Sequence, residues 1–348
     1  MRVAARLFKR ALQLLVLLAL TLSAPVIYVE TMCRGDSAPG PATPLSGETR
    51  PEIRTLLTYP EWHVVHAYDD YAVTIRARDP HDFNYLQAVA GYWSSLCTLT
   101  RDSAALGAID RPTRQLVHVI GVSFTFEMLM KAAYEETLGR VATMIRGPQH
   151  APLDILSAQQ AAGYAAFLQQ VPWYRYDFRA DAAALDAAAT NAIRDRERAI
   201  ALGLEHRARA AYADVIGRAV AATGFDDLTL QMVVTGLTPD QLDATPGVTV
   251  LGPVAGGLEV ETPRYRELTG ILARWADQGA AFLDMAGNDQ IMFTAISAAP
   301  TEDGALASLP RQGYDDTRHL FLVPVTDLAE ALRTLPARGL ALEHVHDY

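Results

Sequence analysis

The chain has 348 residues, of which half are hydrophobic and a fifth are charged, so it can bury a large core and is not a disordered tail. Its formal net charge of −10 argues against a nucleic-acid partner, because nucleic-acid surfaces need lysine and arginine to contact phosphates. Its two cysteines are too few for a disulfide scaffold or a four-cysteine zinc site.

An apolar, uncharged segment at residues 11–29 follows a basic end at residues 1–10. As a helix this segment would be about 28 Å long, close to the thickness of a hydrocarbon core. The positive-inside rule then places the N-terminus in the cytoplasm and the bulk of the chain on the extracytoplasmic side. We therefore expect a single-pass cell-membrane protein whose residues 11–29 form a transmembrane anchor. A cleavable signal peptide is the alternative, although a cut after Ala24 would leave Leu22 at a position that needs a small residue.

Residues 30–54 are rich in proline, glycine, serine and threonine, and they are predicted to form a flexible linker. Cys33 in this linker and Cys97 further along would form a disulfide if both lay in an oxidising compartment. The sequence favours a simpler interpretation, in which Cys33 is unpaired and Cys97 is a buried apolar residue of its helix.

Residues 55–224 are predicted to form an alpha-helical domain. Thr58 and Glu61 have the spacing of a capping box, so the first helix is expected to begin near Tyr59 and to end at Asp79, before Pro80. Hydrophobic spacing and end signals predict further helices. Their expected ranges are 80 to about 96, 110–146, 153–171, 181–202 and 205–223.

Beyond Gly224 the hydrophobic period changes from helical to strand-like. Residues 225–299 show the order strand, helix, strand, strand, helix, strand of a ferredoxin-like α+β module, followed by a strand over 291–297. Residues 300–317 are predicted to be a loop, and residues 318–348 a C-terminal β-α-β extension. This pattern indicates a fold class and no particular activity, because small α+β sandwiches carry many functions.

The common motifs of nucleotide binding and hydrolysis are absent from the sequence. It has no GxxxxGK[ST] loop, no GxGxxG after a strand, no HExxH on a helix and no GxSxG elbow. No nucleotide cofactor is therefore expected, and the motifs leave the identity of any other cofactor unknown.

The predicted helix over 110–146 contains the candidate catalytic residues Glu127, Lys131 and Glu135, four residues apart on one face. A lysine held between two carboxylates in a buried setting is a feature of some catalytic sites. A structural ion triad that bridges helices is the simpler interpretation. A second membrane span over residues 115–130 is a further alternative, but the sequence disfavours it because the segment is short and contains His118 and Glu127.

The first predicted helix carries candidate metal ligands, His63, His66 and Asp70, along one stripe. Two imidazoles and a carboxylate could begin a divalent metal site or form an acid–base pair. A complete site would need another ligand from a second helix, for which Glu127 or Glu135 is the obvious choice. Satisfied polar residues at a helix interface, or a solvated face, explain the stripe with fewer assumptions.

The C-terminal residues His344, His346 and Tyr348 would lie on one side of a strand, and two histidines placed in this way can chelate a metal. Their position at the chain end weakens that interpretation.

These features predict a membrane-anchored, bacterial-type envelope protein that binds a protein partner or a small ligand without turnover. The alternative is a membrane-tethered enzyme with a polar, metal-assisted site in the helical domain. Convergence of the predicted residues on one water-accessible pocket would distinguish the enzyme from the binding protein.

Overall fold

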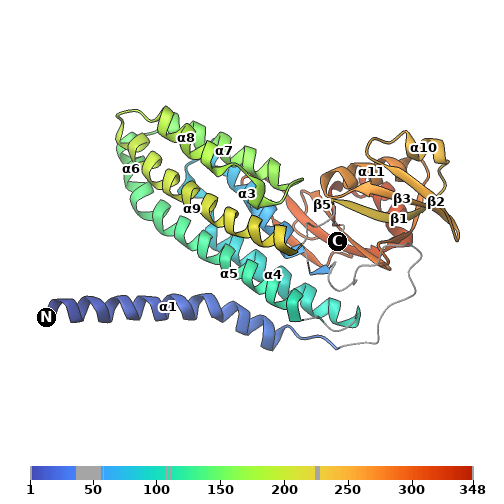
Figure 1. Cartoon of the computed structure of the whole chain (residues 1–348), viewed down its shortest axis with the longest axis horizontal. Helices are drawn as coiled ribbons and strands as arrows, with labels where there is room; N and C mark the ends of the chain where they lie inside the picture. Colours follow the sequence, from blue (N-terminus) through green and yellow to red (C-terminus); the bar gives the residue numbers. More distant parts are fainter. Residues whose placement is uncertain are drawn as a thin grey trace.

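The computed structural model describes residues 2–36, 56–57, 59–106, 109, 111–223 and 228–346. Its parts follow one another along the chain as a long apolar helix, a large helical bundle and two small antiparallel sheets (Figure 1). This coarse order agrees with the order predicted from the sequence.

The N-terminal helix α1 spans Arg2–Met32, and its section Phe8–Met32 is long and apolar enough to cross a membrane. The stretch Arg111–Arg146 meets the same criterion. The described chain therefore contains two candidate spans, where the sequence favoured one. An apolar N-terminal helix of this kind is typical of a membrane anchor or a signal sequence.

A disulfide joins the end of α1 to the bundle. Cys33, directly after α1, is bonded to Cys97 of α4 (Tyr85–Asp102), with the two Cα atoms 5.1 Å apart. The favoured prediction that Cys33 is unpaired is therefore wrong, whereas Cys97 is buried as expected. Most of the predicted linker and Thr58 of the capping box lie outside the described residues.

The bundle consists of long helices packed around α3. Its helical elements are α3 (Tyr59–Ala77), η1 (Pro80–Asp82), α4, η2 (Ser103–Leu106), α5 (Arg111–Tyr134), η3 (Glu135–Gly139), α6 (Arg140–Arg146), α7 (Pro152–Leu168), η4 (Trp173–Arg175), α8 (Phe178–Ala188) and α9 (Ile193–Thr223). Neighbouring helices cover α3 on several sides, so most of its side chains are buried, polar ones included. The π-helical turn η3 connects α5 to α6, so that the three elements form one continuous helix.

Two helix boundaries differ from the prediction. The helix expected to open at Pro80 begins at Tyr85 instead, because Pro80 belongs to a short 3₁₀ turn and Asn84 caps the helix through its side chain. The helix predicted over 181–202 is interrupted, because α8 ends at Ala188 and α9 begins at Ile193. The helix α9 then continues through residues 203–204, where the sequence predicted a break between two helices.

The first sheet is built from residues 229–285. Its elements are β1 (Thr229–Thr235), α10 (Pro239–Asp243), β2 (Thr249–Val254), β3 (Gly257–Pro263), α11 (Arg266–Asp277) and β4 (Ala281–Met285), and its antiparallel strands have the order β2-β3-β1-β4. Alternation along β1 buries Leu230 and Met232 in the same core as Leu272 and Trp275 of α11.

The second sheet has the strand order β6-β7-β5-β8 and is also antiparallel. Its elements are β5 (Gln290–Ser297), β6 (Ala307–Pro310), β7 (Thr317–Pro324), η5 (Val325–Asp327), α12 (Leu328–Thr334), η6 (Pro336–Arg338) and β8 (Ala341–His346). The sequence grouped β5 with the preceding strands, but β5 pairs with β7 and β8. The segment predicted as a loop contains β6.

The two sheets share one hydrophobic core, to which Phe282 of the first sheet and Phe293 of the second both belong. The second sheet also packs against the bundle, because Met292 and Leu320 belong to the same core cluster as Trp62 of α3. This junction brings β8 against α3.

Candidate functional site

Four buried histidines meet where the bundle touches the second sheet, and we call this cluster the histidine seam. His63 and His66 are three residues apart and lie on one face of α3. His344 and His346 are two residues apart and lie on one face of β8. The sequence indicated each pair separately, and the fold brings the two pairs together.

Aromatic rings fill the histidine seam. The ring centroid of Trp62 lies 3.6 Å from that of His344, and the ring centroid of Tyr59 lies 5.1 Å from that of His346. The rings of His66 and His346 are 6.4 Å apart. None of these five side chains lines either of the two pockets described below.

Burial keeps the histidines of the seam neutral. The loss of solvation lowers the pKa of His63 to about 4 and that of His344 to about 3. The same cause lowers the pKa values of His66 and His346 well below the usual value. Each ring therefore presents one donor nitrogen and one acceptor nitrogen at neutral pH.

Hydrogen bonds satisfy only part of the histidine seam. His63 bonds the carbonyl oxygen of Ala88 through Nε2 at 2.8 Å, and Nδ1 of His344 lies 3.1 Å from Oγ1 of Thr269. Within the histidine seam, the ring nitrogens that are buried without a partner in the described chain are Nδ1 of His63, Nε2 of His66, Nε2 of His344 and both nitrogens of His346. Such groups are uncommon in protein interiors, so the histidine seam is an unusually polar and incompletely bonded contact.

Asp70 lies beside the histidine seam. Its Oδ2 accepts a hydrogen bond from the backbone N–H of Gln312 at 3.0 Å. Burial raises the pKa of Asp70 to about 6, although the charge of Arg318 and this hydrogen bond oppose the rise. Arg318 donates to Glu343 at 2.7 Å, and Nδ1 of His66 lies 3.7 Å from the carboxylate of Glu343.

Within the described residues, no group of three or more histidine, cysteine, aspartate or glutamate side chains is placed to hold a metal ion. The predicted ligands His63, His66 and Asp70 point toward different partners: the backbone of α4, a carboxylate of β8 and the loop before β7. Glu127 and Glu135, named as further ligands, pair with α9 instead.

A series of ion pairs, which we call the ion ladder, joins α5 and η3 to the antiparallel helix α9. Its pairs are Glu127 with Arg209, Lys131 with Glu205 at 2.8 Å, and Glu135 with Arg198 at 2.7 Å. The residue numbers rise along α5 and η3 while those of their partners on α9 fall, because the two helices run in opposite directions. The candidate catalytic residues are therefore all engaged in contacts between helices.

The ion ladder continues into α7. Arg194 donates to Asp154 at 2.8 Å, and Arg146 donates to Asp154 at 2.7 Å and to Asp79 at 2.9 Å. Burial alone would raise the pKa of Asp154, but the charges of Arg194 and Arg198 outweigh that effect and hold it at about 2. Buried charges paired in this way support a structural role for the ladder.

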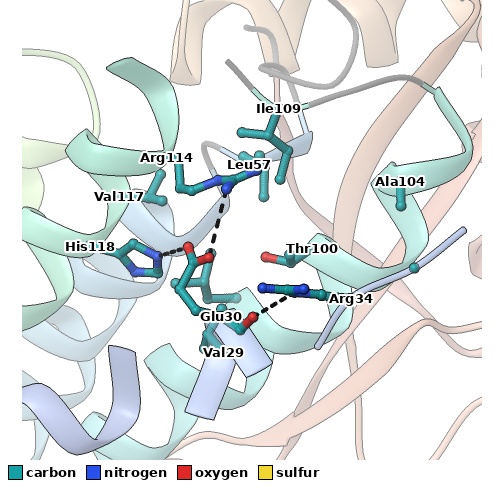
Figure 2. Close-up of a pocket in the computed structure, with 12 residues that line it drawn as sticks. Val29, Glu30, Arg34, Leu57, Thr100, Ala104, Ile109, Arg114, Val117 and His118 are labelled. Atoms are coloured by element: carbon teal, nitrogen blue, oxygen red, sulfur yellow. Dashed lines mark hydrogen bonds and ion pairs between the residues drawn. The ribbon is translucent and has the colours of Figure 1, made fainter. Parts of the chain in front are cut away.

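A pocket of about 390 Å³ lies at the C-terminal end of α1, and we call it the anchor pocket (Figure 2). It is lined by residues of α1, α4, α5 and the segments next to them. These residues are Val29, Glu30, Arg34, Gly35, Leu57, Leu96, Thr100, Ala104, Ile109, Arg114, Val117 and His118.

Glu30 organises the polar wall of the anchor pocket. Its side chain lies 2.8 Å from Nε2 of His118 and 3.7 Å from the guanidinium of Arg114 (Figure 2). Arg34 donates from Nε to the backbone oxygen of Glu30 at 2.8 Å. Within the described chain the guanidinium of Arg34 has no carboxylate partner, so the wall holds more positive than negative groups.

The remaining wall of the anchor pocket is apolar and includes Val29 of α1, Leu96 of α4 and Val117 of α5. Gly35 lets the chain pass close to the end of α4, since a Cβ atom there would lie 2.2 Å from the carbonyl oxygen of Arg101. The pocket therefore joins a cationic surface to an apolar one beside the apolar helix.

The anchor pocket was not predicted from the sequence, because its walls come from segments far apart in the chain. The available signals were Glu30 and Arg34, the first charged residues after the apolar segment. Nothing in the spacing of these residues indicates their contact with Arg114 and His118.

A second pocket, of about 460 Å³, lies at the C-terminal ends of α3 and α6. Its lining includes the Arg146–Asp79 ion pair, so it adjoins the ion ladder. Arg78, His81 and Arg140 add further polar surface. The predicted histidines, glutamates and lysine thus do not converge on either pocket.

Neither the protein-family models, nor the characterised proteins, nor the solved structures with which the chain was compared include a match to it. Of the two pockets, the anchor pocket has more apolar lining residues, and it is the one that lies beside the apolar helix α1.

Proposed function

We propose that this chain is a non-catalytic binding protein held in the membrane by α1, and that its anchor pocket binds an anionic amphiphile. The ligand class is an acyl chain that ends in a phosphate or a carboxylate. The observation that carries this proposal is that Arg34 and Arg114 line the same pocket as an apolar wall. This pocket lies at the end of α1, a helix apolar enough to enter a membrane.

The charge distribution and the disulfide support the orientation that we propose, with the N-terminus in the cytoplasm and the bulk of the chain outside it. Four cations precede the uncharged residues 11–29 of α1, and the positive-inside rule places these cations in the cytoplasm. The Cys33–Cys97 disulfide lies after that section, and disulfides persist in oxidising compartments such as the periplasm.

The walls of the anchor pocket favour an anionic head and an apolar tail. A guanidinium binds phosphate or carboxylate through paired N–H donors, and Arg34 is available for such a contact. The 3.7 Å separation between Arg114 and Glu30 is longer than a strong ion pair, so an anion can compete with Glu30 for Arg114. Val29 and Val117 offer apolar contact to the tail.

We also infer that residues 229–285 form a ferredoxin-like module. The alternation of strands and helices and the strand order β2-β3-β1-β4 support this assignment. The module supplies α11, whose Thr269 lies beside His344 in the histidine seam.

A membrane-tethered enzyme is the second candidate function. The observation in its favour is the set of buried ring nitrogens without partners in the histidine seam, because unsatisfied buried groups are found at some catalytic sites. The separation of the seam from both pockets favours the binding protein.

Calorimetric titration of the full chain in detergent with palmitoyl lysophosphatidic acid tests the proposed function. We expect saturable binding that Arg34→Gln weakens roughly tenfold, since a charge-assisted hydrogen bond contributes about 1.5 kcal/mol. The same lipid with a neutral headgroup, palmitoyl lysophosphatidylcholine, should bind more weakly, and inorganic phosphate alone should bind least.

Arg179→Gln is the matched control, because Arg179 is an exposed arginine of α8 that pairs with Asp214. It should leave the affinity unchanged. Equal affinity for the acidic and the neutral lipid, or an equal effect of the Arg34 and Arg179 variants, would contradict the proposal.

A further inference from the structure

The outward side of α5 and α6 is apolar and is not covered by other parts of the described chain. Phe126 is 43% exposed and Met130 is 56% exposed. We call this surface the outer apolar face; its main members are Leu116, Val119, Phe126, Met130, Val141 and Met144. Exposed apolar patches of this kind mark contact with another protein or with lipid.

The charged residues at positions 115–135 turn away from the outer apolar face. Glu127, Lys131 and Glu135 all pair with α9 in the ion ladder, and His118 turns toward Glu30. Over residues 115–135 the outward side therefore carries no charge for about 30 Å, which matches the thickness of a hydrocarbon core.

Cations lie at both ends of this uncharged stretch. Arg111 and Arg114 stand at its beginning, and Arg140, which pairs with the exposed Glu136, follows its end. Arg114 and Arg140 are each about half exposed. Arginines at such positions face the level of lipid headgroups and attract anionic ones.

The helix α1 lies next to α4 and α5 near its C-terminal end, and its N-terminal end lies on the same side of the view as α6 but apart from it (Figure 1). Glu30 near its end contacts Arg114 and His118, so the two apolar helices approach each other at one end. Leu12 and Leu15 of α1 are exposed, and α1 therefore leaves the outer apolar face open.

We propose that the outer apolar face contacts the acyl chains of a lipid bilayer beside α1. The bundle is then partly embedded in the membrane and is not suspended beyond it on a linker. The sequence disfavoured residues 115–130 as a membrane segment because the segment is short and contains His118 and Glu127. The apolar helical stretch extends over Arg111–Arg146, and both polar side chains are paired within the protein, which removes these objections. This inference does not depend on what the anchor pocket binds.

Spin labels on single cysteines of the full chain, reconstituted in phosphatidylcholine–phosphatidylglycerol vesicles, test the proposal. Val119→Cys, Phe126→Cys and Met130→Cys place the label on the outer apolar face. Ala187→Cys places it on the exposed side of α8, as the control. Both native cysteines are in the disulfide, so the added cysteine is the reactive thiol. Circular dichroism spectra identical to the parent's establish that each variant folds.

The measured quantities are the collision rates of each label with oxygen, which concentrates in acyl chains, and with a water-soluble nickel chelate. We expect the three labels on the outer apolar face to gain oxygen collisions and to lose chelate collisions relative to Ala187→Cys. Chelate collisions equal to the control would place the face in water and overturn the proposal. Low collision rates with both reagents would show that protein covers the face, either α1 or a second copy, and would overturn it as well.

Discussion

The ion ladder lies within the bundle, and the histidine seam lies where the bundle meets the second sheet. Both regions bury polar side chains, but they stabilise them in different ways. In the ladder, Glu135 and Arg198 are fully buried and charged, and each is opposite its counterion. In the seam, His344 and His346 are buried and neutral, and several of their nitrogens have no partner. Two antiparallel helices can place opposite charges in register over several turns, whereas a strand that meets a helix brings rings together with fewer matched donors and acceptors.

Breaking the ion ladder at its most buried pair should give the largest effect. Arg198→Met leaves the carboxylate of Glu135 buried without its partner, and we expect the free energy of unfolding to fall by about 3–5 kcal/mol. Urea denaturation of the full chain in detergent measures this loss.

The double variant Arg198→Met/Glu135→Leu is the control for that measurement. Removing both charges should restore most of the stability, because two apolar side chains replace a buried ion pair at little net cost. A loss below 1 kcal/mol in the single variant would contradict the view that the ladder depends on complete pairing.

Acidification should act on the histidine seam. An unfolded histidine binds a proton near pH 6.5, whereas folded His63 does so near pH 4. Between these values the unfolded state binds more protons, so the stability falls as the pH is lowered, by about 1.4 kcal/mol per pH unit for each such histidine. Asp70 has the opposite effect on stability below pH 6, because its raised pKa lets the folded state bind a proton before the unfolded state does. Its stabilising contribution cancels the loss from about one of the histidines.

His63→Gln isolates this contribution. Between pH 6.5 and pH 5 its loss of stability, from urea midpoints, should be smaller than that of the parent chain by about 2 kcal/mol. Identical slopes in the two proteins would show that His63 does not stay neutral in the fold.

An exposed ion pair should give the smallest effect. Arg207 of α9 pairs with Asp186 of α8, and both side chains are more than half exposed. We expect Arg207→Ala to change the free energy of unfolding by less than about 1 kcal/mol, because water screens the pair. A loss as large as that of Arg198→Met would show that pairing, and not burial, sets the cost.

Local patterns in the sequence predicted the apolar helix, the helical region and most strands. The capping and period rules failed where tertiary contacts decide: α9 continues through Gly203, and α8 ends at Ala188 without a proline or glycine. The sheet to which β5 belongs is decided by its pairing with β7 and β8, and no local sequence pattern predicts that pairing.

The candidate site shows the same division. His63 and His66 were recognisable by helical spacing, and His344 and His346 by strand spacing, but their meeting follows from the contact of β8 with α3. The anchor pocket also depends on contacts between distant segments, since Glu30 and His118 are 88 residues apart in sequence.

A membrane-held binding protein must retain α1 in its mature form. The decisive measurement is the intact mass of the chain extracted from washed membranes of expressing cells, before and after reduction. We predict a mass that includes α1, with an increase of two hydrogens on reduction of the Cys33–Cys97 disulfide. A shorter chain that starts after Ala24 and is recovered in the soluble fraction would contradict the account.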